Sequence, residues 1–474
     1  MQENHSKIVA TIGPKSASVE TLRAMIAAGM NVCRINASHG DYDFHKKIIN
    51  RIRRLNRELK SSVAVIYDLQ GPKIRISEVD TKENVLRENQ EIMLAAGEGI
   101  SDNSVIYVSY NGFYKDVSAG DSVLIDDGKI ELQVLRKNGS DKISAKVVHG
   151  GKLSSRKGVN LPFTKVSLPS LTEKDKNDLA FALENNVEWI GLSFVRKPED
   201  VKELKQIILK QNSEARVIAK IEKPEALRNI DKIVEESDGI MVARGDLGVE
   251  IAMEKVPVIQ KMLVRKCNQA SKPIIIATQM MESMISNFHP TRAETNDVAN
   301  AVFDGADALM LSGETAVGKY PVQVIKEMNK IIRICEEESS IYNRHHPPVS
   351  NSPSIISDSI CYNACLMAEQ SGAKAIIAMT HSGYTAFKIS SQRPRSCIFI
   401  FTDNKPLVNM LSLVWGVKGF YYNKYKSTDN TILEIKNILK KEKLVHPGDS
   451  IINVASMPIH ERGTSNTIKL SVMK

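Results

Sequence analysis

The chain has 474 residues, of which 42% are hydrophobic and 25% are charged, a balance that predicts a soluble globular protein of several domains. The formal net charge of +9 favours anionic partners, but basic residues are dispersed among acidic ones and only 5% of residues are aromatic, so we expect small phosphorylated molecules and no nucleic acid. No apolar run approaches the ~18 residues of a membrane helix, and the start of the chain lacks the apolar segment of a signal peptide, so we expect no membrane partner and a cytoplasmic location.

Short apolar runs alternate with helical patterns near the start of the chain. Strands are predicted over Lys7–Gly13, Asn31–Asn36 and Ser62–Asp68. Helices are predicted over Ser18–Gly29 and near Asp41–Leu59. Because the strand runs are nearly continuously apolar, we expect strands that are buried on both faces, as in a parallel sheet.

This alternation stops after Gly71-Pro72. Residues 72–169 contain short alternating segments and turn signals, including a predicted hairpin over Gly120–Leu135 with its turn at Asp127-Gly128. The sequence therefore predicts an inserted all-β domain of ordinary size.

The alternation resumes with a helix over Thr172–Asn185, which has threonine as a good N-cap. Five more strands are predicted at Trp189–Val195, Ala215–Glu222, Gly239–Arg244, Pro273–Gln279 and Ala308–Gly313. With the first three they make eight parallel-type strands separated by helices. The α/β fold expected is a (β/α)₈ TIM barrel of residues 1–71 and 170–340, with the β domain of residues 72–169 inserted after its third strand.

A segment rich in Glu, Ser, Pro and His, Glu336–Pro353, reads as a linker. Residues 350–474 then predict a smaller, open α/β domain at the C-terminus. Its strands are expected at Ala375–Met379, Ser396–Phe401, Val417–Tyr422, Asp449–Ala455 and Thr467–Met473.

Polar residues gather at the carboxyl ends of the predicted barrel strands, where such barrels carry their active sites. On the fifth strand Lys220 and Glu222 are two residues apart and share a face. With Asp246 from the next strand, Glu222 provides two carboxylates for a hard divalent cation, and a lysine beside that cation suits a moving phosphoryl group. A plain Lys220–Glu222 salt bridge is the alternative. The other strand ends carry Arg34, Asn36, Ser38, Asp68, Thr278, Gln279, Ser312 and Glu314.

Eight motifs in order make the sequence resemble the pyruvate kinase family along essentially its whole length. They are Ala-Thr-Ile-Gly-Pro (10–14), Arg-Ile-Asn-Ala-Ser-His-Gly (34–40), Gly-Pro-Lys-Ile-Arg (71–75), Lys-Gly-Val-Asn-Leu-Pro (157–162), Ala-Lys-Ile-Glu (219–222), Met-Val-Ala-Arg-Gly-Asp-Leu-Gly (241–248), Ala-Thr-Gln-Met-Met-Glu-Ser-Met (277–284) and Leu-Ser-Gly-Glu-Thr-Ala (311–316). The resemblance implies a glycolytic phosphotransferase that converts phosphoenolpyruvate and ADP to pyruvate and ATP, with a mobile lid and a homotetrameric assembly.

The resemblance also implies roles for substrate and metal residues. Glu222 and Asp246 would bind Mg²⁺ or Mn²⁺, and the backbone at Gly245 would face the substrate. Arg34 would hold the phosphoryl group as a fixed multi-donor cation, and Lys220 would neutralise its charge during transfer.

Further roles follow from the same resemblance. Thr278 matches a threonine involved in protonating the enolate, where it either polarises a water or positions the substrate carboxylate, and Ser312 is placed with the catalytic residues. Asn36, Arg75 and Lys157 match positions that contact the nucleotide. Because Arg75 and Lys157 bracket the insertion, closure of the lid would bring them over ADP and exclude water.

The sequence departs from the family at the monovalent-cation region, which corresponds to Asn36, Ser38, Asp68 and Leu69. The potassium-dependent pattern Asp-Thr-Lys-Gly-Pro-Glu is replaced by Asp-Leu-Gln-Gly-Pro-Lys at 68–73. We therefore expect the ammonium of Lys73, with Asp68 as its partner, to replace potassium. A solvated hinge lysine is the alternative.

An effector site is implied in the C-terminal domain by the loop Thr380–Thr385, where Thr380, Ser382, Gly383 and Thr385 lie between a strand and a helix. A sugar phosphate or a nucleotide is the expected effector, and an ordinary helix cap is the alternative. Residues 463–466 resemble the late loop of that site, while the unusual residues 460–462 leave the effector's identity open.

Two readings compete with the kinase. One is another Mg²⁺-dependent barrel lyase or aldolase acting on pyruvate or phosphoenolpyruvate, which would not need a lid with nucleotide-contacting basic residues. The other is a catalytically silent, effector-binding homologue, against which the intact Lys220, Glu222, Asp246 and Thr278 argue.

Overall fold

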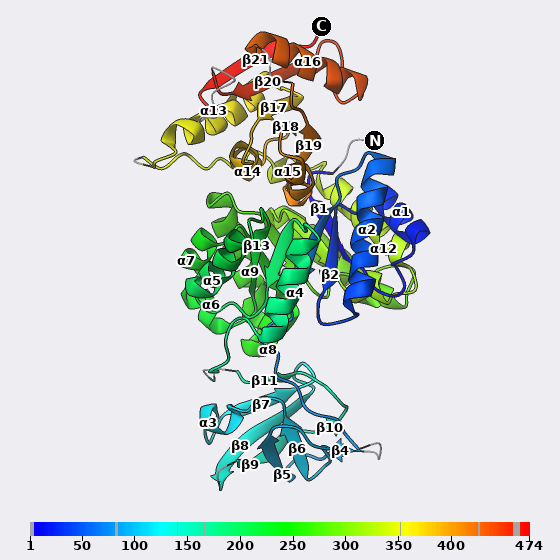
Figure 1. The fold of residues 1–474 in the computed structure, drawn as a ribbon, viewed down its shortest axis with the longest axis vertical. Coiled ribbons are helices and arrows are strands. Elements are labelled where there is room, and N and C mark those ends of the chain that lie inside the picture. The colour runs from blue at the N-terminus through cyan, green and yellow to red at the C-terminus, as the bar shows by residue number, and fades with distance from the viewer. Residues whose placement is uncertain are drawn as a thin grey trace.

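The structure, a computed structural model, describes residues 4–80, 84–139, 141–162, 164, 166–350, 352–424, 427–457 and 465–474. Three bodies follow one another along the long axis of the molecule (Figure 1). The inserted β domain lies at one end, a barrel lies in the middle, and the C-terminal domain lies at the other end.

The middle body is a closed barrel whose eight strands are all parallel, in the ring order β1-β16-β15-β14-β13-β12-β3-β2. The strands are β1 (Lys7–Thr11), β2 (Val32–Asn36), β3 (Ala64–Asp68), β12 (Trp189–Leu192), β13 (Arg216–Ile221), β14 (Gly239–Ala243), β15 (Ile274–Ala277) and β16 (Ala308–Leu311). Strand β3 pairs directly with β12, so the ring closes across the insertion. The predicted barrel, interrupted after its third strand, is confirmed.

Helices surround the barrel, and their caps lie where the sequence places them. Ser18 caps the first helix, Gly29 ends it with φ 116°, and Thr172 forms a capping box with Asp175. The helices are α1 (Val19–Ala28), α2 (Tyr42–Leu59), α4 (Glu173–Glu184), α5 (Pro198–Lys210), α6 (Pro224–Arg228), α7 (Ile230–Glu236), α8 (Arg244–Glu250), α9 (Val256–Gln269), α10 (Arg292–Asp304), α11 (Gly313–Ala316) and α12 (Pro321–Cys335).

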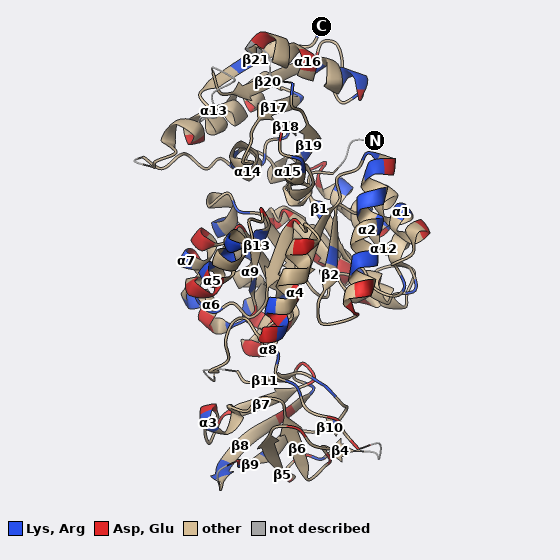
Figure 2. Cartoon of the chain, in the orientation of Figure 1, with Lys and Arg blue, Asp and Glu red and all other residues tan. Residues whose placement is uncertain are grey.

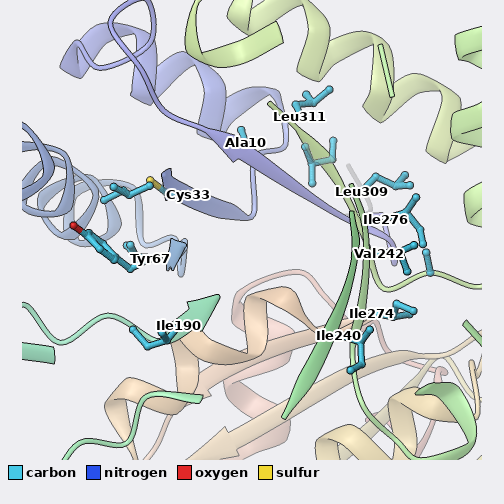
Figure 3. Close-up of a cluster of buried hydrophobic side chains, with 14 of the residues drawn as sticks. Ala10, Cys33, Tyr67, Ile190, Ile240, Val242, Ile274, Ile276, Leu309 and Leu311 are labelled. Atoms are coloured by element: carbon cyan, nitrogen blue, oxygen red, sulfur yellow. The ribbon is translucent and has the colours of Figure 1, made fainter. Parts of the chain in front are cut away.

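The barrel strands are buried on both faces, as their apolar runs predict. Alternate residues such as Ile240 and Val242 point outward to the helices (Figure 3), while the intervening Met241 belongs to the inner core with Ile218 and Trp189. This packing fixes the register of every strand, because a slip by one residue would exchange the two faces. It therefore fixes which side chains reach the carboxyl end of the barrel.

The inserted domain, called the lid below, contains a six-stranded sheet in the order β11-β7-β8-β9-β5-β6 and a small β10-β4 pair. The predicted hairpin is confirmed, since Ile125 pairs with Ile130 across a turn that contains Asp127 and Gly128. Among its described residues the domain also contains a short helix, α3 (Phe113–Asp116), and a parallel strand pair, β5–β6. Its strands are β4 (Val85–Leu86), β5 (Glu91–Ala96), β6 (Val105–Val108), β7 (Ser122–Ile125), β8 (Ile130–Asn138), β9 (Lys142–His149), β10 (Gly151–Lys152) and β11 (Val159–Asn160).

The C-terminal domain is an open sheet in the order β19-β18-β17-β20-β21, in which only β21 is antiparallel. The strands β17 (Ala375–Met379), β18 (Cys397–Thr402), β19 (Val417–Tyr421), β20 (Ser450–Ala455) and β21 (Thr467–Val472) agree with the predicted strands within about two residues. The helices are α13 (Ile355–Ser371), α14 (Tyr384–Ser391), α15 (Lys405–Met410) and α16 (Thr428–Lys441).

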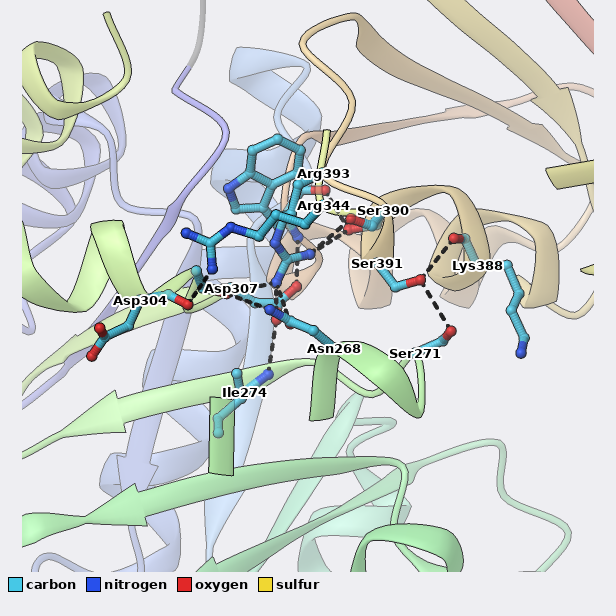
Figure 4. Close-up of polar contacts among 12 residues, drawn as sticks. Asn268, Ser271, Ile274, Asp304, Asp307, Arg344, Lys388, Ser390, Ser391 and Arg393 are labelled. Carbon is cyan, nitrogen blue, oxygen red and sulfur yellow. Dashed lines mark hydrogen bonds and ion pairs between the residues drawn. The ribbon is translucent and has the colours of Figure 1, made fainter. Parts of the chain in front are cut away.

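A buried polar network joins the C-terminal domain to the barrel (Figure 4). Its centre is Arg393, which is only 1% exposed. Arg393 Nη2 donates to Asp307 Oδ2 and to Asn268 Oδ1, each at 2.8 Å. The end of the barrel opposite the lid is therefore attached to the C-terminal domain by charge-assisted hydrogen bonds.

Lys and Arg positions are interspersed with Asp and Glu positions along the barrel helices and do not form a stripe of one sign (Figure 2). Within the part of the chain that the structure describes, no helix combines the length and apolarity needed to cross a bilayer.

Candidate active site

A continuous chain of ion pairs links four charged side chains at the lid-facing end of the barrel. Arg34, Asp68 and Lys220 lie on β2, β3 and β13, and Glu222 directly follows β13. Arg34 Nη2 lies 2.6 Å from Asp68 Oδ2, and Asp68 Oδ1 lies 3.2 Å from Lys220 Nζ. Lys220 Nζ in turn lies 2.9 Å from Glu222 Oε1. The salt bridge proposed as the plain alternative for Lys220 and Glu222 is thus present, but it is one link of a larger cluster.

The pKa values of the two carboxyl groups that flank Lys220 shift in opposite directions. Burial raises the pKa of both, but the cations Lys220 and Arg34 outweigh burial at Asp68 and lower its pKa. At Glu222 burial and repulsion from Asp246 outweigh Lys220, so the pKa of Glu222 is raised. The pKa of Lys220 is raised because attraction to Asp68 and Glu222 exceeds the opposing effect of burial. Lys220 therefore holds a firmly charged ammonium between two acids of unequal strength.

Glu222 and Asp246 fit a divalent cation by charge and by donor type. Their mutual repulsion is what an added cation would relieve, and carboxylate oxygens are the ligands that Mg²⁺ and Mn²⁺ accept. Glu222 is oriented by the backbone N–H of Phe194, which donates to Oε2 at 2.8 Å. Among the described residues no group of three or more His, Cys, Asp or Glu side chains could hold a metal, so two carboxylates would need substrate oxygens and water to complete a coordination shell.

Thr278 lies beside the turn that follows β14. The backbone N–H of Gly245 donates to Thr278 Oγ1 at 2.8 Å, and that hydroxyl donates to the carbonyl of Ala277 at 2.6 Å. A Cβ at position 245 would lie 3.3 Å from Thr278 Oγ1, a tight contact that glycine avoids. The hydroxyl is therefore held between two backbone groups, next to Asp246.

Ser312 follows β16, where its backbone N–H donates to Glu314 Oε2 at 2.7 Å. Glu314 also accepts from the N–H of Met281 at 3.2 Å, and burial raises its pKa. Glu314 thus connects the segments that follow β15 and β16. Its place among the strand-end residues is that of a structural support.

The monovalent-cation region is assembled differently from the expectation in one respect. Lys73 Nζ lies 3.8 Å from Asp246 Oδ1, whereas Asp68 is already paired with Arg34 and Lys220. The partner of Lys73 is therefore Asp246 and not the expected Asp68, because two buried cations already neutralise that carboxylate.

The other members of this region lie close by. Asn36 Oδ1 accepts from the backbone N–H of Ser38 at 3.1 Å, and the side chain of Leu69 is 1% exposed. The neighbouring His39 has a lowered pKa because of burial and of the nearby cations Arg75, Arg34 and Lys73. Arg75 and Lys73 thus lie near the loop after β2, so three cations face this part of the site.

The two lid residues expected to contact the nucleotide make contacts within the lid. Arg75 Nη1 donates to the carbonyl of Arg156 at 3.0 Å, and Lys157 Nζ lies 3.0 Å from Asp126 Oδ1. The lid meets the barrel through Asn160, whose amide donates to Glu250 Oε1 at 2.8 Å. Glu250 ends α8, the helix that carries Asp246.

Sequence reasoning missed two residues of the site. Ser193 is 1% exposed, accepts from Lys220 Nζ at 2.7 Å and donates to the carbonyl of Leu69 at 2.7 Å. It follows β12, so the rule that located the other strand-end residues could have found it. Arg244 forms a two-point ion pair with Asp297, and no spacing rule could have found that pair.

The segment Thr380–Thr385 runs into the first turn of α14, which begins at Tyr384. The N–H of Gly383 donates to Thr380 Oγ1 at 3.1 Å, and the N–H of Tyr384 donates to Ser382 Oγ at 3.4 Å. Thr385 Oγ1 lies 3.0 Å from Ser465 Oγ. Two of these hydroxyls thus accept from backbone N–H groups at the start of α14, and the effector site and the ordinary helix cap both stay predictions. Of residues 460–466, only 465 and 466 lie within the described residues.

Comparisons with known proteins cover the whole chain. Family models match residues 3–325 ("Pyruvate kinase, barrel domain") and 358–471 ("Pyruvate kinase, alpha/beta domain"). A pyruvate kinase of Clostridium perfringens is 41% identical over 473 residues, covering 98% of this chain and 99% of the relative. One of Bacillus licheniformis is 42% identical over 473 residues, covering 99% of this chain and 80% of the relative. The crystal structure of a pyruvate kinase from Cryptosporidium parvum has a TM-score of 0.91 at 37% identity and covers 99% of this chain and 96% of that one.

Proposed function

The chain belongs to the pyruvate kinase family of phosphotransferases, and on this premise we propose that it transfers the phosphoryl group of phosphoenolpyruvate to ADP, giving pyruvate and ATP in cytoplasmic glycolysis. The observation that carries the proposal is the buried chain Arg34–Asp68–Lys220–Glu222 at the barrel end that faces the lid. Its two cations support the proposal, because a transferring phosphoryl group needs compensation of its charge.

The residues divide the work by their chemistry. Arg34 is oriented by Asp68 and would hold the phosphoryl oxygens, while the ammonium of Lys220 would offset charge as the phosphoryl group moves. Glu222 and Asp246 would hold Mg²⁺ or Mn²⁺, which when bound supplies further charge neutralisation to the substrate. Asn36, Arg75 and Lys157 would contact the nucleotide, with lid closure excluding water.

Thr278 would act in the protonation of the enolate. Its hydroxyl proton is engaged by the carbonyl of Ala277, and an unperturbed hydroxyl is a poor acid. The role that suits this geometry is to polarise and orient a water, with Ser312 contributing at the end of the neighbouring strand. Gly245 would present its N–H to the substrate carboxylate once the substrate displaces the Gly245–Thr278 hydrogen bond.

The experiment that tests the function is a lactate-dehydrogenase-coupled assay with phosphoenolpyruvate, ADP and MgCl₂. ADP-dependent formation of pyruvate supports the kinase. Consumption of phosphoenolpyruvate or pyruvate without ADP would favour a barrel lyase, and inactivity together with binding of a phosphorylated ligand would favour a silent homologue.

Potassium independence is part of the proposal. Lys73 brings a tethered ammonium to within 3.8 Å of Asp246, and Leu69 offers no side-chain oxygen to a cation. We expect full activity in tetramethylammonium salts at fixed ionic strength. Lys73→Glu should lower that activity, and potassium should restore part of it, because the ion can then replace the lost charge.

The matched control for this test is Lys152→Glu at an exposed position of the lid, which should change neither the activity nor its response to potassium. Strong activation of the unaltered enzyme by potassium would reject the proposal and leave Lys73 as a hinge residue. The proposed function also includes a homotetrameric assembly and a phosphorylated effector that binds at Thr380–Thr385.

A further inference from the structure

Two consecutive residues after β15 have left-handed backbone conformations. Thr278 has φ 71° and Gln279 has φ 54°. A β-branched residue rarely adopts this region, because its branched Cβ crowds the backbone. Such a conformation persists only where the surrounding structure holds it, and it often marks a site where geometry serves function.

Arg244 supplies that restraint. Its Nη2 donates to the carbonyl of Thr278 at 2.8 Å. The same guanidinium is fixed by Asp297 on α10, with Nη1–Oδ1 and Nη2–Oδ2 distances of 2.7 Å each. Gly245, the next residue, donates its N–H to Thr278 Oγ1. Residues 244 and 245 therefore hold the carbonyl and the hydroxyl of the same threonine.

We infer that Arg244 is a positioning residue that, braced by Asp297, holds Thr278 in its left-handed conformation and so fixes the Thr278 hydroxyl beside Gly245 and Asp246. The inference rests on the proposed function, because it assigns Arg244 to the step in which Thr278 acts. Arg244 reaches the chemistry only through the backbone of Thr278.

Only arginine suits this arrangement. Its planar fork presents parallel N–H donors to both carboxylate oxygens of Asp297 and still has a donor for the carbonyl of Thr278. A lysine at this position has a single ammonium on a flexible stem and cannot reproduce the two-point pair. Without that brace Thr278 is free to return to φ below 0°, which would move its hydroxyl away from Gly245.

The test compares Arg244→Lys, Asp297→Asn and Thr278→Ala with the unaltered enzyme. A misplaced catalytic group can cost about 10²-fold in rate, so we expect Arg244→Lys to lower kcat by about that factor while KM for phosphoenolpyruvate changes little. Exchange of the C3 protons of pyruvate should fall in parallel, and Asp297→Asn should have the same effect in weaker form.

A double-mutant cycle separates positioning from general structural damage. In the Thr278→Ala background Arg244→Lys should cost almost nothing further, because its effect passes through Thr278. Lys261→Met, which removes another ion pair to α10 without touching Thr278, is the matched control and should keep kcat.

Near-normal kcat in Arg244→Lys, or additive losses in the double variant, would overturn the inference while the proposed function stands. A fall in the thermal midpoint with unchanged kcat per folded molecule would equally overturn it. If the unaltered enzyme forms no pyruvate from phosphoenolpyruvate and ADP, the proposed function is wrong and this inference falls with it.

Discussion

Lys220 is held by three polar groups at once, Asp68, Glu222 and Ser193, and its side chain is 11% exposed. These contacts hold the ammonium in one place, so in the proposed function its charge would be preorganised for the transition state. Removing it has two separable consequences. The phosphoryl group loses a cation, and Glu222 loses its partner while remaining buried.

Lys220→Met should therefore lose about 3–4 kcal/mol of transition-state stabilisation, or ~10²–10³ in turnover. Proton exchange from pyruvate, measured by tritium release, should suffer less, because no phosphoryl group moves in that step. The matched control is Lys205→Met, which breaks an ion pair with Asp238 away from the site. Turnover close to normal in Lys220→Met would remove this residue from the mechanism.

Glu222 links the site to pH. Because its pKa is raised above the ordinary 4.5 by burial and by Asp246, the ionised form is disfavoured in the folded protein. The destabilisation is present above the folded-state pKa and is relieved as pH falls through it. A metal needs the ionised carboxylate, so metal and proton compete for the same group.

We expect Mn²⁺ binding without substrate to release protons and to weaken as pH falls from neutral toward the ordinary carboxyl range. Calorimetry in two buffers of different ionisation enthalpy measures the released protons. Glu222→Gln should abolish the release and weaken binding, whereas the exposed Glu254→Gln should behave normally. Proton release that persists in Glu222→Gln would place the coupling on another group.

For single residues, the sequence predicts well which side chains face the site. It predicts less well which of them form ion pairs with one another. Strand periodicity and strand ends locate Lys220 and Glu222 without any structure. The partner of Lys73 could not be predicted, because it depends on how Arg34 and Lys220 already neutralise Asp68. Arg244 and Asp297 are 53 residues apart in the chain, so their pairing requires the fold.

Among the elements, β13 runs from the C-terminal domain to the lid-facing end of the barrel. Its first residue, Arg216, donates to the carbonyl of Ser382 in the proposed effector loop at 2.6 Å. Lys220 lies four residues along the same strand, at the opposite end. The Arg216 guanidinium also lies 4.7 Å from the ring centre of Phe387 on α14. The loop and α14 are thus in direct contact with the strand that carries Lys220, so a shift of the loop would act on that strand.

A phosphorylated effector at Thr380–Thr385 should change the affinity for phosphoenolpyruvate by 5–150-fold, which corresponds to a coupling of about 1–3 kcal/mol. Sugar phosphates and nucleoside monophosphates can be screened by thermal shift and then by kinetics. Ser382→Asp should block binding by charge repulsion, while Arg216→Met should keep binding but reduce the coupling.

If no such ligand binds, or if Ser382→Asp responds like the unaltered protein, the loop is a helix cap alone. Equal coupling in Arg216→Met would instead exclude the route through β13 while leaving the effector site in place.

Element types were easier to predict than their contacts. The lid is recognisable because period-two segments interrupt a pattern of buried parallel strands. Its docking through Asn160 and Glu250 could not be predicted, since it depends on where two separately folded bodies meet. The short α3 was missed because four residues are too few for a helical period to appear.

At the scale of the molecule, the barrel and the C-terminal domain share one buried interface. Arg393 Nη2 donates across it to Asp307, Asn268 and Gly305 of the barrel, each at 2.8 Å, while Arg393 Nη1 donates to Ser390 within the C-terminal domain. Its guanidinium also lies 5.0 Å from the ring centre of Trp415. These contacts predict that the two domains unfold together, although each has its own apolar core.

Arg393→Met should break this cooperation. The substitution leaves Asp307 buried at 2% exposure without its cation, and breaking a buried pair in this way costs about 3–5 kcal/mol. The chain has two tryptophans, and both report on the interface, since Trp189 donates to the carbonyl of Met410 and the N–H of Trp415 donates to Asp307. Urea unfolding followed by fluorescence should therefore separate from unfolding followed by circular dichroism.

The double variant Arg393→Met with Asp307→Asn separates two causes of instability. One is the unpaired carboxylate of Asp307, and the other is the loss of the packing of the arginine side chain. Removing the unpaired carboxylate should restore part of the stability, because the remaining amide is cheaper to bury than an ion. The control Arg395→Met, an exposed arginine over Tyr342, should leave the single transition intact. A single coincident transition in Arg393→Met would mean that apolar contacts alone, such as Trp189 against the C-terminal domain, hold the two domains together.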